Sequence, residues 1–279
     1  MRLLLLSSAL FLLAACTEPA SESTADTPTA PAVEMPALAT AADSVAMQAY
    51  AYAGGPEAWA SVEALRFDFA FERDGERVPI RHHLWDRTSG AYRIDWSNGD
   101  TLYTALFNAN QLDVDGPDAG TVYRDGEVLP DPEHAEALEG AHRAYLNDTY
   151  WLLLPIKLFD PGVTRGLDAD SSDAETAVLT LAFDGVGLTP GDTYHVYVDR
   201  ATGAVARWAF VLESGGSAAY DWVDYQTFDT AAGPIRLSAR KANDQGRVLL
   251  TDALALPTDL EPTVFTDPAQ RLSAPAIDA

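Results

Sequence analysis

Apolar and polar residues alternate along much of this chain, and this period of two restricts the possible folds more than any other feature. Residues 65–71 read Leu-Arg-Phe-Asp-Phe-Ala-Phe, so every second side chain is large and apolar. Successive side chains of a β-strand point to opposite faces, and the segment therefore predicts a strand with one buried face. Asp74-Gly75 follows almost at once, and an Asp-Gly pair at this place is typical of a tight hairpin turn.

Strand-like segments recur at hairpin spacing along the rest of the chain. They are predicted at residues 78–85, 91–96, 101–107, 111–114, 121–124, 176–183, 193–199, 205–213, 219–228, 235–241 and 247–256. Together these segments indicate an antiparallel sheet of about eleven strands. A sheet this long curls, closes or is covered, because a flat one leaves its edges and its apolar face exposed.

Two regions with helical patterns can cover that face. Residues 43–53 predict a first helix, with Asp43 as its N-cap. Within the later insertion, residues 133–146 predict one helix and residues 148–158 a second apolar helix or lid segment, broken at Pro155. The expected fold class is therefore mainly β with a helical lid (α+β), in which a large curved antiparallel sheet carries an N-terminal helix and a helical insertion.

The first fifteen residues have the features of a signal peptide. Arg2 supplies positive charge, Leu3–Leu13 form an apolar stretch too short to span a bilayer, and two alanines precede Cys16. The tetrapeptide Leu13-Ala14-Ala15-Cys16 resembles the lipobox of bacterial lipoproteins. This resemblance implies cleavage before Cys16 and acylation of its thiol, and two or three acyl chains anchor a protein firmly to a membrane.

The remaining chain divides into three parts. Residues 16–42 are expected to form the lipidated N-terminus and a flexible linker, because they contain no aromatic residue and no hydrophobic period. Residues 43–265 are expected to form a single domain and residues 266–279 a C-terminal tail. Thr17 follows the cysteine where aspartate would resemble an inner-membrane retention signal. The expected location is thus the cell envelope, lipid-anchored to the outer membrane and facing the periplasm.

The chain is strongly acidic, with 42 Asp and Glu residues against 18 Lys and Arg residues and a formal net charge of −24. This balance argues against a nucleic-acid partner, because phosphates require basic patches. An acidic surface of this kind either serves as a docking face for a basic partner or is simply solvated, and the sequence leaves both interpretations open.

The predicted architecture, on a chain with a lipobox, resembles that of the Lol-type lipoprotein carriers and receptors, closest to uncharacterised membrane-anchored bacterial lipoproteins of that class. The resemblance covers residues 43–256 and rests on three features: the strand order, Gly54-Gly55-Pro56-Glu57-Ala58-Trp59 before the first long strand, and Tyr150-Trp151-Leu152-Leu153-Leu154-Pro155 in the insertion. It implies an unclosed half-barrel with a helical lid, and a lipid or lipoprotein ligand. None of these motifs is a catalytic signature.

Several aromatic residues and one cation are candidates for a ligand site. The aromatic candidates for lining an apolar cavity are Phe67, Phe69, Trp85, Trp96, Trp151 and Trp208. They could equally fill an ordinary core, since aromatic residues are common inside β-sheets. Lys157 lies within the apolar lid segment, where its amine either reaches solvent or contacts an anionic ligand head group.

No catalytic motif, metal site or cofactor site is indicated by the sequence. His82 and His83 are adjacent, so on a strand they point to opposite faces and cannot both join one site with His195. The GxSxG and SxxK motifs are absent, and acylation of Cys16 leaves no thiol nucleophile. Paired carboxylates, as in glycosidases, remain as an enzymatic alternative.

The sequence therefore predicts a non-enzymatic periplasmic lipoprotein that binds an apolar or acyl ligand, or a lipidated protein, in a half-barrel cavity. The cavity is expected between the concave face of the sheet and residues 133–158. An interaction or scaffolding lipoprotein with an acidic surface and a filled core is the first alternative, and a carboxylate-based hydrolase is the second.

Overall fold

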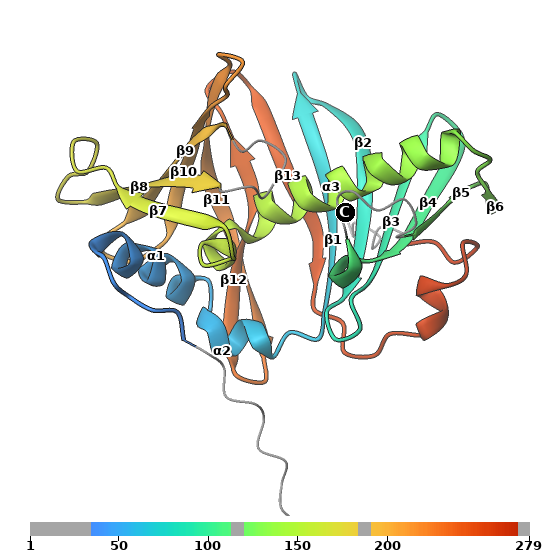
Figure 1. The fold of residues 1–279 in the computed structure, drawn as a ribbon, viewed down its shortest axis with the longest axis horizontal. Helices are drawn as coiled ribbons and strands as arrows, with labels where there is room; N and C mark the ends of the chain where they lie inside the picture. The colour runs from blue at the N-terminus through green and yellow to red at the C-terminus, as the bar shows by residue number, and fades with distance from the viewer. Residues whose placement is uncertain (1–34, 113–119, 184–190, 273–279) are drawn as a thin grey trace, which may run out of the picture. The chain divides into compact units, whose positions relative to one another are not determined.

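A computed structural model describes residues 35–112, 120–183 and 191–272, which belong to the unit formed by residues 33–279. Within them, thirteen strands form one sheet in the order β6-β5-β4-β3-β2-β1-β13-β12-β11-β10-β9-β8-β7 (Figure 1). The strands are β1 (Ala64–Arg73), β2 (Glu76–Asp86), β3 (Ala91–Asn98), β4 (Thr101–Asn108), β5 (Gly120–Arg124), β6 (Glu127–Val128), β7 (Val163–Leu167), β8 (Thr176–Phe183), β9 (Thr193–Asp199), β10 (Val205–Val211), β11 (Ser217–Thr230), β12 (Gly233–Ala242) and β13 (Arg247–Ala255). Strands β6 and β7 are the two ends of this order, so the antiparallel sheet is unclosed, as expected.

The strand count differs from the expected eleven because of short elements. β6 has only two residues, and β7 reads Val-Thr-Arg-Gly-Leu, in which apolar and polar residues do not alternate. Where a strand was expected at residues 111–114, the chain instead turns through the 3-10 helix η1 (Ala109–Gln111). The Asn108 side chain accepts a hydrogen bond from Asn110 N at 2.9 Å, a local contact that competes with strand formation. Residues 113–114 lie outside the described residues.

Two short helices precede the sheet. Helix α1 (Ala41–Tyr52) begins earlier than expected, because its N-cap is Thr40 and not Asp43. The Thr40 hydroxyl accepts from Asp43 N at 3.1 Å, and the Asp43 carboxylate accepts from Thr40 N at 2.9 Å, which is a reciprocal capping box. Arg165 on β7 binds the second carboxylate oxygen of Asp43 at 2.9 Å and so ties α1 to the edge of the sheet. Helix α2 (Gly55–Ala60) follows directly.

The insertion forms one continuous helix, α3 (Glu133–Lys157), where two helices were expected. Pro155 does not break it: the helix continues past this residue to Lys157, although proline has no N–H to donate to the carbonyl oxygen of Trp151. Figure 1 shows α3 crossing the sheet from the β3–β5 half to the β7–β12 half, so the insertion covers the curved face as expected. Within the described residues, no helix combines the length and apolarity needed to cross a bilayer.

Two separate hydrophobic clusters lie beneath α3. The first half of the helix packs through Leu138 and Ala141 against Tyr92, Ile94 and Phe107 of strands β3 and β4. The second half joins a larger cluster formed with α1, α2 and the strands from β1 through β13 to β8. The helix therefore connects two cores, and its middle turn spans the boundary between them.

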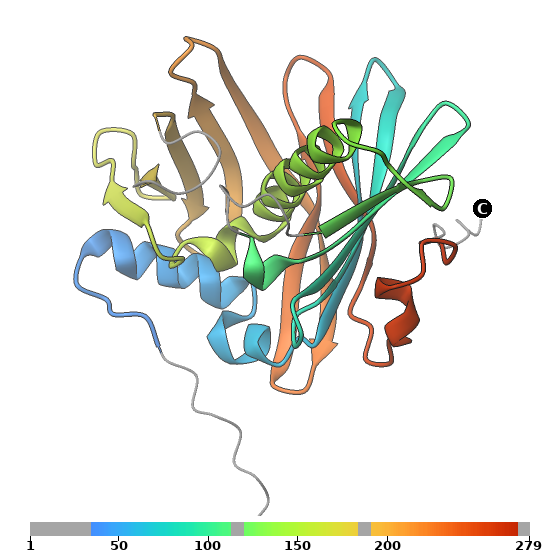
Figure 2. The ribbon, with the colours of Figure 1, turned by 45° about the vertical axis from the view of Figure 1, so that its right-hand side comes forward.

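The opposite face of β3 is covered by the C-terminal segment (Figure 2). Arg93 and Asp95 are both buried there, and Arg93 Nε donates to Asp95 at 2.9 Å. The Arg93 guanidinium also donates to the carbonyl oxygens of Val264 and Asp267 at 2.8 and 2.9 Å. Leu272 N donates to Asp95 at 2.9 Å, so residues 264–272 are held against the sheet by a buried ion pair.

Candidate functional site

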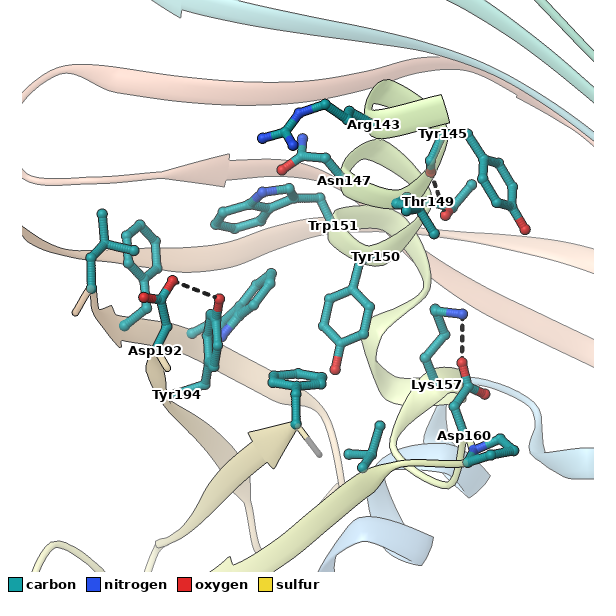
Figure 3. A pocket seen from close by; sticks show the side chains of 17 residues that line it. Arg143, Tyr145, Asn147, Thr149, Tyr150, Trp151, Lys157, Asp160, Asp192 and Tyr194 are labelled. Carbon is teal, nitrogen blue, oxygen red and sulfur yellow. Dashed lines mark hydrogen bonds and ion pairs between the residues drawn. The ribbon is translucent and has the colours of Figure 1, made fainter. Parts of the chain in front are cut away.

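A cavity of about 470 Å³ lies between the second half of α3 and strands β7 to β10. Figure 3 shows Tyr150 and Trp151 reaching into it from α3, with Tyr194 facing them from β9. Its volume lies within the range of about 300–1,000 Å³ that is usual for small-molecule sites. The expected cavity between the sheet and the insertion is therefore present, although it occupies only one half of the covered face.

Aromatic rings form most of the cavity wall. The ring centroids of Trp151 and Trp208 are 4.2 Å apart, and those of Tyr194 and Trp208 are 5.6 Å apart. Phe183 lies edge-on to Tyr194 at 5.2 Å, and Phe210 lies 6.3 Å from Trp151. A wall of this kind offers a large apolar contact area at low entropic cost, since aromatic side chains have few rotamers to lose.

An ion pair and a hydrogen-bonded carboxylate lie at the edges of the aromatic wall. Lys157 Nζ is 2.5 Å from a carboxylate oxygen of Asp160, so the cation in the lid segment already has an anionic partner. Asp192 accepts hydrogen bonds from the Tyr194 hydroxyl at 3.1 Å and from Glu213 N at 2.9 Å. Both carboxylates are thus engaged by the protein itself.

The remaining rim carries Arg143 and Asn147, one helical turn apart on α3. Both side chains are exposed, and Figure 3 shows them side by side at the end of the cavity away from Lys157. Asn147 Nδ2 donates to Asp148 at 2.8 Å, whereas Arg143 makes no ion pair or hydrogen bond with any described residue. At this end of the rim, the positive charge of Arg143 is therefore not paired with any described side chain.

The Tyr150 ring extends from α3 into the cavity (Figure 3). Its hydroxyl is buried and finds no hydrogen-bond partner among the described residues. Burial raises the pKa of Tyr150 well above its usual value, so the hydroxyl stays protonated at physiological pH. A buried donor without an acceptor is uncommon in proteins and adds one polar group to an otherwise apolar wall.

Only some of the residues proposed from sequence line the cavity, namely Trp151, Trp208 and Lys157. The four others lie outside its lining: Phe67, Phe69, Trp85 and Trp96 belong to strands β1, β2 and β3. Phe67 and Phe69 lie in the larger hydrophobic cluster together with Trp151 and Trp208, and the Phe67 ring stacks on the His83 ring with centroids 4.4 Å apart. Cys16 and the expected signal peptide lie outside the described residues.

The cavity is also lined by aromatic residues that were not among the candidates from the sequence, namely Tyr145, Tyr150, Phe183, Tyr194 and Phe210. Phe210 lies two residues from Trp208 on β10, so the period of two already placed both on one face of the sheet. The sequence therefore indicated that both side chains lie on one face of the sheet, but it did not indicate that α3 lies above that face.

A buried polar cluster lies under the middle turn of α3, between the two hydrophobic cores. Asp148 is fully buried and accepts two hydrogen bonds from the Arg81 guanidinium, at 2.6 and 2.8 Å. His83 Nε2 lies 3.0 Å from the same carboxylate, and His83 Nδ1 lies 3.0 Å from the Tyr92 hydroxyl. The cluster joins α3 to strands β2 and β3 through polar contacts, whereas the two hydrophobic clusters on either side of it hold α3 on the sheet through apolar contacts.

The protonation states of this cluster follow from its surroundings. Burial would raise the pKa of Asp148, but the hydrogen bonds from His83 and Arg81 outweigh it and hold the pKa below its usual value. Burial lowers the pKa of His83 more strongly than Asp148 raises it, so the imidazole is neutral at pH 7. A neutral His83 then donates from Nε2 to Asp148 and accepts at Nδ1 from Tyr92.

Lys241 on β12 is a buried cation, as Arg93 is, but it has no carboxylate partner among the described residues. Its Nζ donates to Ser238 O at 2.5 Å and to the Thr251 hydroxyl at 3.3 Å, and it lies 4.8 Å from the centre of the Trp222 ring. Burial lowers the pKa of Lys241 to about 7. Lys241 is not part of the cavity wall.

The histidines do not converge on a metal site. His82 faces away from His83 and lies 2.8 Å from Asp68, and His195 lies 3.9 Å from Asp168. In the described part of the chain, no group of three or more His, Cys, Asp or Glu side chains is arranged to hold a metal ion.

No protein-family description matches the sequence, and no curated protein does. Solved structures resemble the fold at low identity. A LolA superfamily protein from Nitrosomonas europaea is 12% identical, with 82% of this chain and 99% of that chain covered and a TM-score of 0.43. A DUF1329 family protein from Desulfovibrio piger is 10% identical, with 80% and 96% covered and a TM-score of 0.44.

A third solved structure is a domain from Vibrio parahaemolyticus described as an outer membrane lipoprotein-sorting protein. It is 12% identical, with 80% of this chain and 94% of that chain covered and a TM-score of 0.40. The Lol-type resemblance expected from the sequence is thus found among solved structures. At these values the function has to come from the residues of the chain itself.

Proposed function

We propose that this chain is a non-enzymatic lipoprotein of the bacterial envelope, tethered through Cys16, that holds an apolar or acyl ligand in the cavity beneath α3. The ligand is either a free amphiphile or the acyl part of a lipidated protein. The observation that carries the proposal is the cavity itself, with its volume of about 470 Å³ and its aromatic wall. Large apolar pockets with a few polar groups at the rim are the usual form of small-molecule binding sites.

The rest of the covered face supports a single site of this kind. The β1–β5 half is filled by side chains of the protein, with Tyr92 and Ile94 fully buried against the first half of α3. Among the described residues beneath α3, the cavity beside Trp151 and Trp208 is therefore the place that we assign to the ligand. The same two residues supply intrinsic fluorescence that a bound ligand would alter.

Binding of an uncharged chain tests the proposal directly. The mature chain with Cys16→Ala keeps every described residue, and we expect it to bind dodecanol saturably, with one molecule per chain, as a change in tryptophan fluorescence. Val163→Trp places an indole inside the cavity, since Val163 lines it, and should weaken binding at least about tenfold because overpacking or displacement costs about 1–3 kcal/mol.

The matched control is Val223→Trp, the same substitution at an exposed position of β11 outside the cavity. It should leave the dodecanol affinity within about twofold of the parent. Leu212→Trp, at the cavity rim, gives a second blocking variant if Val163→Trp unfolds. Absence of saturable binding, or equal binding by all three variants, would contradict the proposal and favour a scaffolding role through the acidic surface.

The membrane tether is a separate prediction. In the native host, Cys16→Ala should move the protein from the membrane fraction to the soluble fraction, and incorporation of a clickable palmitate analogue should be lost. The expected change in the membrane-bound share is more than about tenfold, because the variant lacks the acylated cysteine and so loses the two or three acyl chains that anchor a protein firmly. Ser21→Ala, in the expected linker, is the control, and a membrane-bound Cys16→Ala chain would contradict the tether.

A further inference from the structure

We infer that the ligand of the aromatic cavity carries one anionic head group, a carboxylate or a phosphate, and that Arg143 and Asn147 bind this group at the rim. The inference rests on the proposed function and adds the chemical class of the ligand. It also assigns the head group to a different cation from Lys157, the one that the sequence suggested.

Lys157 is poorly placed to bind an anion. Its amine lies 2.5 Å from Asp160, and the two side chains are three residues apart at the end of α3. An anionic head group there would have to displace Asp160 or approach its carboxylate. Since like charges at short distance repel, this end of the cavity favours the apolar part of a ligand.

Arg143 has the opposite properties. Its side chain is exposed at the rim and makes no ion pair or hydrogen bond with a described residue, although the chain carries 42 acidic groups against 18 basic ones. A guanidinium presents its N–H groups in a planar fork that fits the two oxygens of a carboxylate or phosphate. In Figure 3 the guanidinium lies beside the Asn147 amide at one end of the cavity.

Asn147 completes this end of the site. One of its N–H groups donates to the buried carboxylate of Asp148 at 2.8 Å, which fixes the orientation of the amide. The amide nitrogen carries a second N–H that a ligand oxygen can accept. A head group at this position thus meets one charged and one neutral donor. The apolar part of the ligand then contacts the aromatic wall.

The other charged residues of the cavity also favour the Arg143 end as the place of an anionic head group. Asp192 lies on the β9 side, engaged by Tyr194 and Glu213, and Asp160 lies at the far end. An anion is repelled from both positions, and the overall charge of −24 gives no general attraction. Binding of an anionic amphiphile therefore depends on the local contact with Arg143.

Four dodecyl compounds with different head groups test the inference: dodecanoate, dodecyl phosphate, dodecanol and dodecylammonium. For the mature chain with Cys16→Ala at pH 7.5, we expect dodecanoate or dodecyl phosphate to bind about tenfold more tightly than dodecanol, as one charge-assisted bidentate contact provides. The tighter of the two anions distinguishes a carboxylate from a phosphate source. In Arg143→Gln, this preference over dodecanol should fall to about twofold or less.

Arg207→Gln is the matched control, because Arg207 lies on β10 next to Trp208 but pairs with Asp221 on the other face of the sheet. It removes the same charge and should keep the tenfold preference. Binding of both anions by the parent chain no tighter than that of dodecanol, an unchanged preference in Arg143→Gln, or tighter binding of dodecylammonium would overturn the inference while leaving the proposed function intact. If no dodecyl compound binds, the proposed function fails instead.

Discussion

Replacing Asp148 with alanine is expected to lower the free energy of unfolding by about 3–5 kcal/mol, the usual cost of removing one partner from a buried ion pair. Asp148 is completely buried and holds Arg81 through two hydrogen bonds and His83 through a third. Without the carboxylate, Arg81 and His83 keep donors that no longer have an acceptor. The middle of α3 also loses its polar connection to the sheet, at the boundary between the two hydrophobic cores.

Urea unfolding followed by tryptophan fluorescence at pH 7 measures this loss. The control is Glu133→Ala on the same helix, where the ion pair with Arg124 is exposed on both sides and is worth less than about 1 kcal/mol. A loss for Asp148→Ala no larger than that of the control would show that apolar packing alone holds α3 on the sheet.

The contribution of the Asp148 carboxylate to stability also has a defined pH dependence, which Asp148→Asn measures. Because the folded protein holds the pKa of Asp148 below its usual value of about 3.9, the carboxylate contributes stability above pH 4. That contribution is lost as the pH falls through the lower, folded-state pKa. The stability difference between the parent and Asp148→Asn should therefore be constant from pH 5 to pH 7 and shrink below pH 4. A difference that grows on acidification would contradict this assignment.

Replacing Lys241 with methionine is expected to stabilise the protein at pH 7 by up to about 4 kcal/mol. In the unfolded chain the amine titrates near its usual pKa of about 10.4, whereas burial lowers the folded-state pKa of Lys241 to about 7. Each unit of that difference corresponds to about 1.36 kcal/mol, which gives the upper limit of the effect. Methionine has a similar length and leaves Ser238 O satisfied, because the Thr251 hydroxyl donates to it at 2.9 Å.

The sign of the pH dependence separates this explanation from a simple packing effect. Between pH 7 and about 10.4 the unfolded chain binds more protons than the folded protein, so the parent gains stability as the pH rises. Lys241→Met lacks this gain, and the two proteins should therefore converge in stability toward pH 10. The control is Lys157→Met, at the only other lysine of the chain, whose side chain is partly exposed and paired with Asp160; this substitution should not stabilise the protein at pH 7. A stability difference for Lys241→Met that is flat from pH 6 to pH 10 would contradict the lowered pKa.

Local signals in the sequence were sufficient for most of the sheet. The alternation at residues 65–71 predicted β1, and Asp74-Gly75 predicted the turn after it. In the structure both residues of that turn have positive φ, 54° and 81°, as a two-residue hairpin of the Asp-Gly type requires. These features depend only on neighbours in the chain, and the sequence contains them completely. β6 and β7 were missed because their residues carry no such local pattern.

The helical insertion shows where local signals end. Its residues predicted helix correctly, but Pro155 suggested a break that the structure does not have, because α3 continues to Lys157. The residues on both sides of Pro155 are buried in the larger hydrophobic cluster, a tertiary contact that the local sequence does not contain. Likewise Asp43 carried a helix-start signal, and only the reciprocal bonds with Thr40 decided which residue is the N-cap.

The sequence by itself determined most of the strands, the acidic balance and the lipobox-like N-terminus. Only the tertiary structure decided that α3 crosses the sheet with Asp148 above Arg81 and His83, partners 67 and 65 residues away. That crossing fills one half of the sheet and leaves the cavity beside Trp151 and Trp208 in the other. The physical reason is that both the cavity and the shifted pKa values depend on burial and on contacts between distant segments, which a local period does not encode.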